Sequence, residues 1–192
     1  ITLPTNEKVE QQDMNKAKQS EAITLIVDTQ RDENGNIKKD DEGKPMNIVY
    51  FFEGQPQIVD DNNDGIAENS NLAKEVFLGN DGSVQRGIRK ILHDRNKQVL
   101  AKIDDLKVKW RAKELSPNKD KNDSIYQAMA KEIRNDSTLT RPVVVIKATP
   151  GASWESLISA LDEMQINQIS RYQIDNINHT DSMMIEAYNR TH

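Results

Sequence analysis

Two stretches near the start of the chain combine apolar and β-branched residues in a way that is typical of strands. Residues 22–28, AITLIVD, place Ile23, Leu25 and Val27 at alternate positions. A second apolar run, MNIVYFFEG, follows a charged stretch with Asn-Gly at 35–36 and Glu-Gly at 43–44. The pattern predicts two antiparallel strands joined by a long polar hairpin.

The middle of the chain has helical periodicity. Between Val84 and Trp110, apolar residues recur at intervals of three and four, with an interruption at 93–98. A shorter helix is expected from Ser124, its predicted N-cap, because Ile125, Met129 and Ile133 lie four residues apart. This region therefore predicts two helices.

The last third predicts a strand, a helix, a strand and a terminal helix. PVVVIKA at 142–148 is a strand; Ser153 caps a helix over 153–164; ISRYQI alternates again; and a final helix follows a cap at Thr180 or Asp181. We expect an α+β fold in which a small mixed β-sheet carries helices on one face, with an inserted helical segment at about 60–140.

Composition limits the function classes. The 192 residues suffice for one domain with an insertion, and the absence of cysteine excludes disulfides, thiolate zinc sites and cysteine nucleophiles. Residues 28–82 carry 13 acidic and 5 basic side chains, whereas residues 83–123 carry 6 and 12. Because the net charge is −5 and few aromatics accompany the basic helix, a solvated helix face is favoured over nucleic-acid binding.

The turn ATPGAS at 148–153 precedes the best-defined helix. It contains one glycine and lacks the Gly-Lys-Ser/Thr of a phosphate loop, and Ser153 lacks the Gly-x-Ser-x-Gly pattern of a nucleophile elbow. A capping serine behind a turn proline is the favoured interpretation, and an enzyme with a phosphate-type ligand at Gly151 is a weaker one. The three histidines have no metal-ligand spacing, and no acid/base pair stands out. We therefore expect no enzymatic activity.

An acidic loop, DDNNDGIAENSN, resembles the first half of a calcium loop. Asp60, Asn62 and Asp64 occupy alternate positions ahead of Gly65, but the twelfth position is Asn71 where a bidentate glutamate is usual. Two hypotheses stay open for this loop. It is either a calcium site, in which case the chain is a secreted or surface calcium-stabilised binding module, or an ordinary solvated turn.

Several segments together resemble the periplasmic domain of the ExbD/TolR biopolymer-transport family. They are ITLPTN, AITLIVD, NIVYFFEG and RPVVVIKATPGASWESLISALDEMQINQISRYQI, in that order. In that family a transmembrane helix and a Leu-Pro linker precede a strand, a hairpin strand, a helix, a strand, a helix and a final strand. The match covers roughly the first fifth and the last third of the chain, and residues 60–140 exceed the family's single helix at that place.

The resemblance implies a subunit of a proton-motive-force-driven complex at the bacterial inner membrane, with this domain in the periplasm. Residues 1–21 would be the linker after a single membrane anchor upstream of Ile1, since no apolar run of 18 residues occurs within the chain. The implied partners are an ExbB/TolQ-like channel protein, a TonB/TolA-like transducer and a second copy of the chain. The domain would supply binding surfaces and no catalytic residue, cofactor or nucleic-acid contact.

Overall fold

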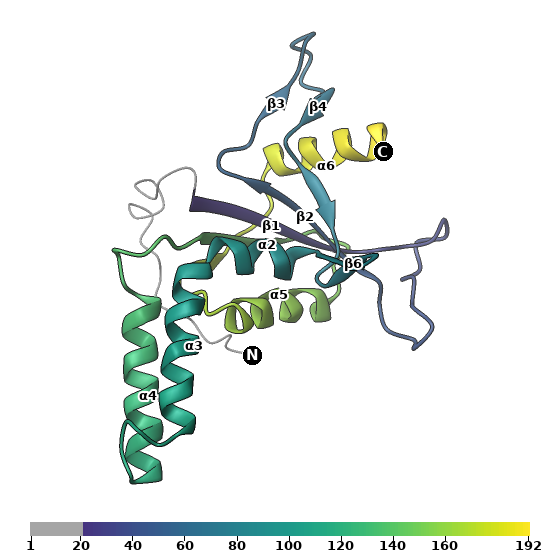
Figure 1. Ribbon diagram of the computed structural model, residues 1–192. Helices are drawn as coiled ribbons and strands as arrows, with labels where there is room; N and C mark the ends of the chain where they lie inside the picture. The colour runs from purple at the N-terminus through teal and green to yellow at the C-terminus, as the bar shows by residue number, and fades with distance from the viewer. Residues whose placement is uncertain (1–20) are drawn as a thin grey trace.

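The computed structural model describes residues 21–192, and its centre is a five-stranded mixed sheet with the order β5-β2-β1-β8-β9 (Figure 1). The predicted linker at 1–21 lies outside the described residues except for Glu21. The strands are β1 (Ala22–Thr29), β2 (Asn47–Glu53), β5 (Ala73–Glu75), β8 (Val143–Ala148) and β9 (Tyr172–Ile174).

The predicted antiparallel pairing of the first two strands is confirmed, and the structure adds two parallel pairs. β1 pairs with β2 in antiparallel register, with Leu25 opposite Phe51, and bridges Arg31–Ile37 and Lys39–Pro45 hold the long hairpin between them. β1 and β8 are parallel, as are β8 and β9. The carboxyl ends of β1 and β8 therefore lie side by side at one edge of the sheet.

Helices cover both faces of this sheet. Helices α2 (Ile88–Arg95) and α5 (Trp154–Ile166) pack on one face, where Leu25 and Val27 join Leu92 and Met164 in the larger core cluster. Helix α6 (His179–Thr191) lies on the opposite face (Figure 1). The α+β class and the mixed sheet are confirmed, whereas the expectation of helices on one face is corrected by α6.

Helix α6 covers the second face because that face is also apolar. Ile26, Tyr50 and Phe52 point to it and pack against Met184 of α6. A buried ion pair ties the start of α6 to the sheet: Lys147 Nζ of β8 lies 2.6 Å from Asp181 Oδ2. The two side chains are only 11% and 2% exposed, so this pair is almost completely removed from solvent.

Side-chain caps set where the helices begin. Ser153 caps α5 as predicted, since its Oγ accepts a hydrogen bond from the Ser156 N–H. The N-cap of helix α6 is Asn178, so the predicted caps Thr180 and Asp181 lie two and three residues too late. Asp181 instead completes a capping box with Asn178. Helix α4 (Lys119–Arg134) begins after Asn118, because Asn118 accepts from the Lys121 N–H, so the prediction of Ser124 as the cap is wrong.

The segment between β2 and β8 starts with short strands. β3 (Ile58–Val59) pairs with β4 (Asn69–Ser70), and β6 (Gly79–Asp81) pairs with β7 (Val84–Arg86). Gly87 has a φ of 100°, a value outside the helical region, so the helical stripe expected from Val84 begins only at Ile88. The predicted interruption at 93–98 is the break between α2 and α3 (Lys97–Arg111) at Asn96.

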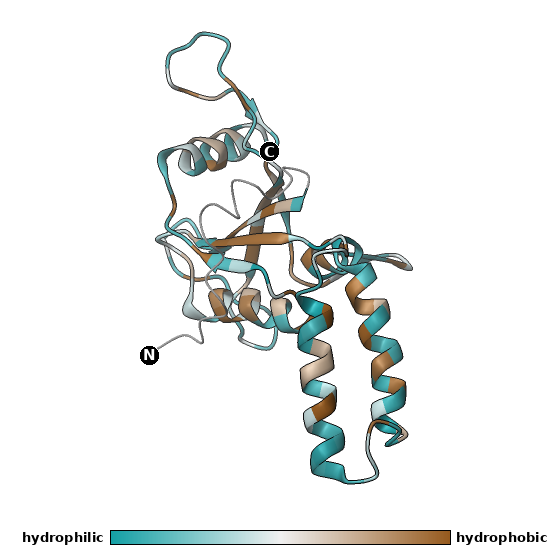
Figure 2. Cartoon of the chain, turned by 90° about the vertical axis from the view of Figure 1, so that its left-hand side faces the viewer, coloured by the Kyte–Doolittle hydropathy of each residue, from teal (hydrophilic) through white to brown (hydrophobic). Residues whose placement is uncertain are grey.

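Helices α3 and α4 form a hairpin that extends away from the sheet (Figure 1). Leu106, Tyr126 and Ala130 give it a small core of its own, and the Trp110 ring stacks on Tyr126 with centroids 4.5 Å apart. Figure 2 shows hydrophobic residues along the sheet strands and hydrophilic residues at the far end of the hairpin. Within residues 21–192, none of the helices has the length and apolarity that crossing a membrane requires.

Polar contacts fasten α2 and its junction with α3 to α5. Arg89 Nη2 donates to Glu163 Oε1 at 2.8 Å, and the Glu163 side chain is 4% exposed. Asn96, at the α2–α3 junction, donates through Nδ2 to the carbonyls of Asn167 (2.7 Å) and Gln168 (3.0 Å). The two Asn96 bonds satisfy carbonyl groups that the end of α5 would otherwise leave unpaired.

Candidate functional site

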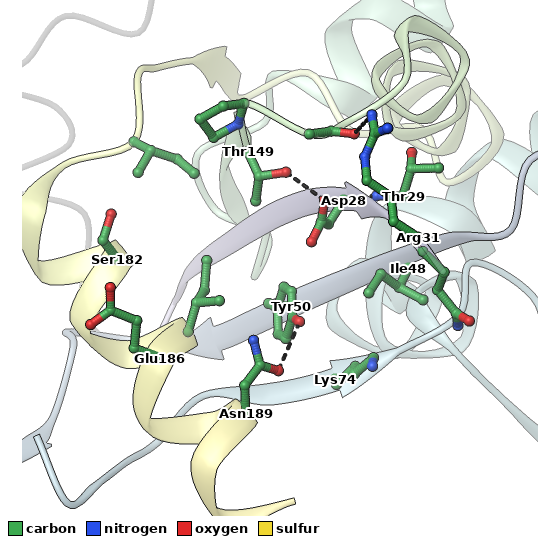
Figure 3. Close-up of a pocket in the computed structure, with 15 residues that line it drawn as sticks. Asp28, Thr29, Arg31, Ile48, Tyr50, Lys74, Thr149, Ser182, Glu186 and Asn189 are labelled. Atoms are coloured by element: carbon green, nitrogen blue, oxygen red, sulfur yellow. Dashed lines mark hydrogen bonds between the residues drawn. The ribbon is translucent and has the colours of Figure 1, made fainter. Parts of the chain in front are cut away.

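The first candidate site is a groove of about 680 Å³ between α6 and the sheet, at the carboxyl ends of β1 and β8. In Figure 3 the side chains of Ser182, Glu186 and Asn189 lie along α6 beside strand residues Asp28 and Tyr50. Loops after parallel strands diverge at this edge, which is where α/β sheets commonly leave room for a ligand. The fold thus brings together residues from both ends of the chain.

Polar bonds at the strand ends hold one wall of the groove in place. Thr149 Oγ1 donates to Asp28 Oδ1 at 2.6 Å, and the Thr29 N–H donates to the same oxygen at 2.8 Å. Arg31 Nη2 donates to the Gly151 carbonyl at 3.0 Å, which links the β1–β2 hairpin to the Gly151 turn. These contacts fix the positions of the acidic Asp28 and the basic Arg31 side chains.

Tyr50 forms part of the floor. Its hydroxyl donates to Asn189 Oδ1 at 3.3 Å, and Lys74 Nζ lies 5.9 Å from its ring centroid. Burial raises the pKa of the Tyr50 phenol above its ordinary value, because the ionised form would lose its hydration. The phenol is therefore neutral at physiological pH and acts as a hydrogen-bonding group.

The Gly151 turn does not have the geometry of an anion loop. Its Gly151 carbonyl faces Arg31, and the Ser153 N–H is already used in a 2.8 Å bond to Thr29 Oγ1. The Ser153 hydroxyl donates to Asn47 Oδ1 at 3.0 Å while it caps α5. An anion needs convergent free N–H groups, so these contacts support the capping interpretation.

The chemistry of the groove suits recognition of a polypeptide segment. Its described lining contains no histidine, and it carries charges of both signs: Asp28 and Glu186 against Arg31 and Lys74. Apolar side chains such as Ile48 and Ile185 lie between them. Mixed charge, hydrogen-bonding groups and an apolar floor match the main chain and side chains of a peptide better than a small uniform anion.

The acidic loop brings together two of its three predicted residues. Asp60, Asp64 and Glu68 each offer a carboxylate oxygen, and these oxygens lie within 4.8 Å of one another. Asn62 instead donates through Nδ2 to Glu68 Oε1 at 3.1 Å. The Asp60 carboxylate accepts from the Asp64 and Gly65 N–H groups at 3.2 and 3.0 Å, which is also ordinary turn chemistry.

Sequence reasoning missed Glu68 and the whole groove. Glu68 is the ninth residue of the loop counted from Asp60, a position that often contributes a ligand in calcium loops, so counting further would have found it. The groove has no local motif, because its walls come from β1, β2, β5 and α6. These residues come together only through the pairing of the strands in the sheet and the packing of α6 against it.

Comparisons with family models, with curated proteins and with solved structures find no match for this chain.

Proposed function

We propose that this chain is the periplasmic domain of an ExbD/TolR-like subunit in a proton-motive-force-driven, energy-transducing complex of the bacterial inner membrane. It acts through contacts with other proteins and not as an enzyme. The observation that carries the proposal is the order of its central elements: strand, hairpin strand, helix, strand, helix, strand. β1, β2, α2, β8, α5 and β9 follow that order.

The arrangement of these elements also supports the proposal. The two helices of that order, α2 and α5, share one face of the sheet. The α3–α4 hairpin follows α2 directly and returns to β8, so it extends the basic plan without interrupting the sheet.

The groove is the surface we assign to partner recognition. The partners are an ExbB/TolQ-like channel, a TonB/TolA-like transducer and a second copy of the chain, with a membrane anchor upstream of Ile1. A segment of the transducer that carries both a basic and an acidic side chain would pair with Glu186 and Arg31 across the groove.

Site-specific cross-linking in the natural full-length protein tests this function. A photo-reactive residue replaces Ser182 in the groove, and a matched one replaces Val108, which is 65% exposed on the hairpin. We expect the Ser182 position to yield cross-links to a single-span transducer, and the charge reversal Glu186→Arg to remove them. The proposal fails if the protein is only monomeric and no multi-span channel protein copurifies with it.

The alternative function is a secreted or surface calcium-stabilised binding module. It is favoured by the convergence of Asp60, Asp64 and Glu68 in an exposed loop. The sequence upstream of Ile1 distinguishes the two proposals. A cleavable signal peptide would favour the module, and an apolar span that contains an aspartate would favour energy coupling.

A further inference from the structure

The far end of the α3–α4 hairpin carries the whole positive charge excess of that hairpin. Residues 107–121, the hairpin tip, contain six basic and two acidic side chains, whereas residues 97–106 and 122–134 each contain two of either sign. The six basic residues are Lys107, Lys109, Arg111, Lys113, Lys119 and Lys121. A chain with a net charge of −5 therefore places a compact group of cations at the end of one arm.

These six cations have no opposite charge beside them. All but the half-buried Lys107 are exposed, and within residues 21–192 none of them forms an ion pair. Like charges that lie close together on a helix repel each other, so this grouping costs stability when nothing faces it. A polyanionic surface would remove that cost, because each cation would then lie near negative charge.

The hairpin tip is also held in a fixed shape. Asn122, which is 3% exposed, donates through Nδ2 to the Trp110 carbonyl at 2.8 Å, and its Oδ1 accepts from the Ser116 N–H at 3.3 Å. Trp110 Nε1 donates to Asp123 Oδ1 at 2.8 Å. These bonds tie the turn to both helices, so the cations are presented together and little ordering is needed on binding.

The position and chemistry of the hairpin tip suit a flat, anionic surface. Figure 1 and Figure 2 show the turn between α3 and α4 at the end of the hairpin that lies away from the sheet. The one aromatic residue of the tip, Trp110, stacks on Tyr126 and is therefore not free to stack on a nucleic-acid base. Val108, between two lysines, is 65% exposed, which suits the boundary between lipid headgroups and acyl chains.

We propose that the hairpin tip binds the surface of a bilayer that contains anionic phospholipids, with its cations among the headgroups. Five of the six cations are lysines, whose flexible and strongly hydrated ammonium groups act as point charges and need no fixed partner geometry. Each cation near such a surface strengthens binding about fivefold. The inference does not depend on the proposed energy-coupling function or on the groove beside α6.

Two variants that lose the same charge test this binding. The tip variant is Lys109→Gln/Arg111→Gln/Lys121→Gln, and the control, outside the tip, is Lys38→Gln/Lys39→Gln/Lys97→Gln. All six residues are exposed, and none forms an ion pair in the described part of the chain. Each 192-residue protein is floated with vesicles of phosphatidylcholine alone and with vesicles of equal parts phosphatidylglycerol and phosphatidylcholine.

We expect the unmodified chain to float only with the phosphatidylglycerol vesicles and to be released at about 1 M salt, where charges are screened beyond about 3 Å. The tip variant should bind about a hundredfold more weakly, and the control less than about threefold more weakly. Equal losses in both variants, or equal binding to phosphatidylcholine alone, would overturn the proposal.

Absence of flotation would also overturn it. Tip-dependent binding of a single-stranded oligonucleotide would then assign the tip to nucleic acid, and salt-sensitive self-association in sedimentation would assign it to a second copy of the chain. If circular dichroism shows that the tip variant is unfolded, Arg111→Gln alone decides, with an expected loss of about fivefold.

Discussion

Breaking the ion pair between Lys147 and Asp181 should cost far more stability than its distance alone suggests. Its Nζ–Oδ2 distance is 2.6 Å, and the same 2.6 Å separates Lys90 Nζ from Asp94 Oδ1 on the surface of α2. The difference is burial: the second pair is 44% and 54% exposed. Distance is thus held constant while desolvation changes.

The substitution Asp181→Asn removes the charge but keeps an oxygen that can still accept the Asn178 N–H at the start of α6. It leaves Lys147 buried opposite a neutral group. Breaking a buried pair in this way costs about 3–5 kcal/mol, whereas the matched Asp94→Asn should cost about 0.3–0.5 kcal/mol. A loss of that size is a large fraction of the total stability of a domain.

Urea unfolding followed by circular dichroism measures both variants. We also expect the double variant Lys147→Met/Asp181→Asn to be more stable than Asp181→Asn alone, because methionine removes the unpaired buried charge. If Asp181→Asn costs no more than Asp94→Asn, the pair is not desolvated and α6 does not seal this face as described.

Three further predictions follow from polar groups elsewhere in the fold. Asn96→Leu should lower the free energy of unfolding by about 1–3 kcal/mol, because two buried carbonyls at the end of α5 lose their donor; an unchanged urea midpoint would contradict this. The raised pKa of Tyr50 implies that its contribution to stability is complete below pH 10.0, the ordinary pKa, and is lost as the pH rises through its folded pKa. Tyr50→Phe should therefore flatten the alkaline loss of stability and remove one late-titrating phenol from the absorbance at 295 nm. If the alternative function holds, calcium should bind the acidic loop with a dissociation constant of about 10⁻⁴–10⁻³ M and lose that binding in Asp60→Asn/Asp64→Asn; no calorimetric heat at millimolar calcium would refute a site there and leave the solvated turn.

Periodicity predicted the central strands and the helix after Ser153 because each is decided by local residues. The alternation of Ile23, Leu25 and Val27 needs one buried face, and that face exists. The same strand held the signal that was missed: Ile26 and Val27 are both fully buried, so an apolar residue stood on each face. Buried residues on both sides of a strand indicate a sheet covered twice, which requires a helix such as α6.

The candidate sites were harder to predict than the fold because they depend on contacts between distant segments. The bond from Thr149 to Asp28 joins residues 121 positions apart, and that from Tyr50 to Asn189 joins residues 139 apart. Neither pair has a spacing that marks it in the sequence. The acidic loop was recognisable because Asp60, Asp64 and Gly65 are close in sequence and act through one tight turn.

The parallel pairing of β1 with β8 has a consequence for the order in which the chain can fold. During synthesis, β1 and β2 emerge first, but the edge of β1 that β8 occupies stays open until Val143–Ala148 has left the ribosome. The α3–α4 hairpin is built from contacts close in sequence and can form during that interval. Its formation brings the end of α4 back toward the open edge of β1. An insertion that seems to lengthen the path between the two central strands therefore shortens the loop that folding has to close.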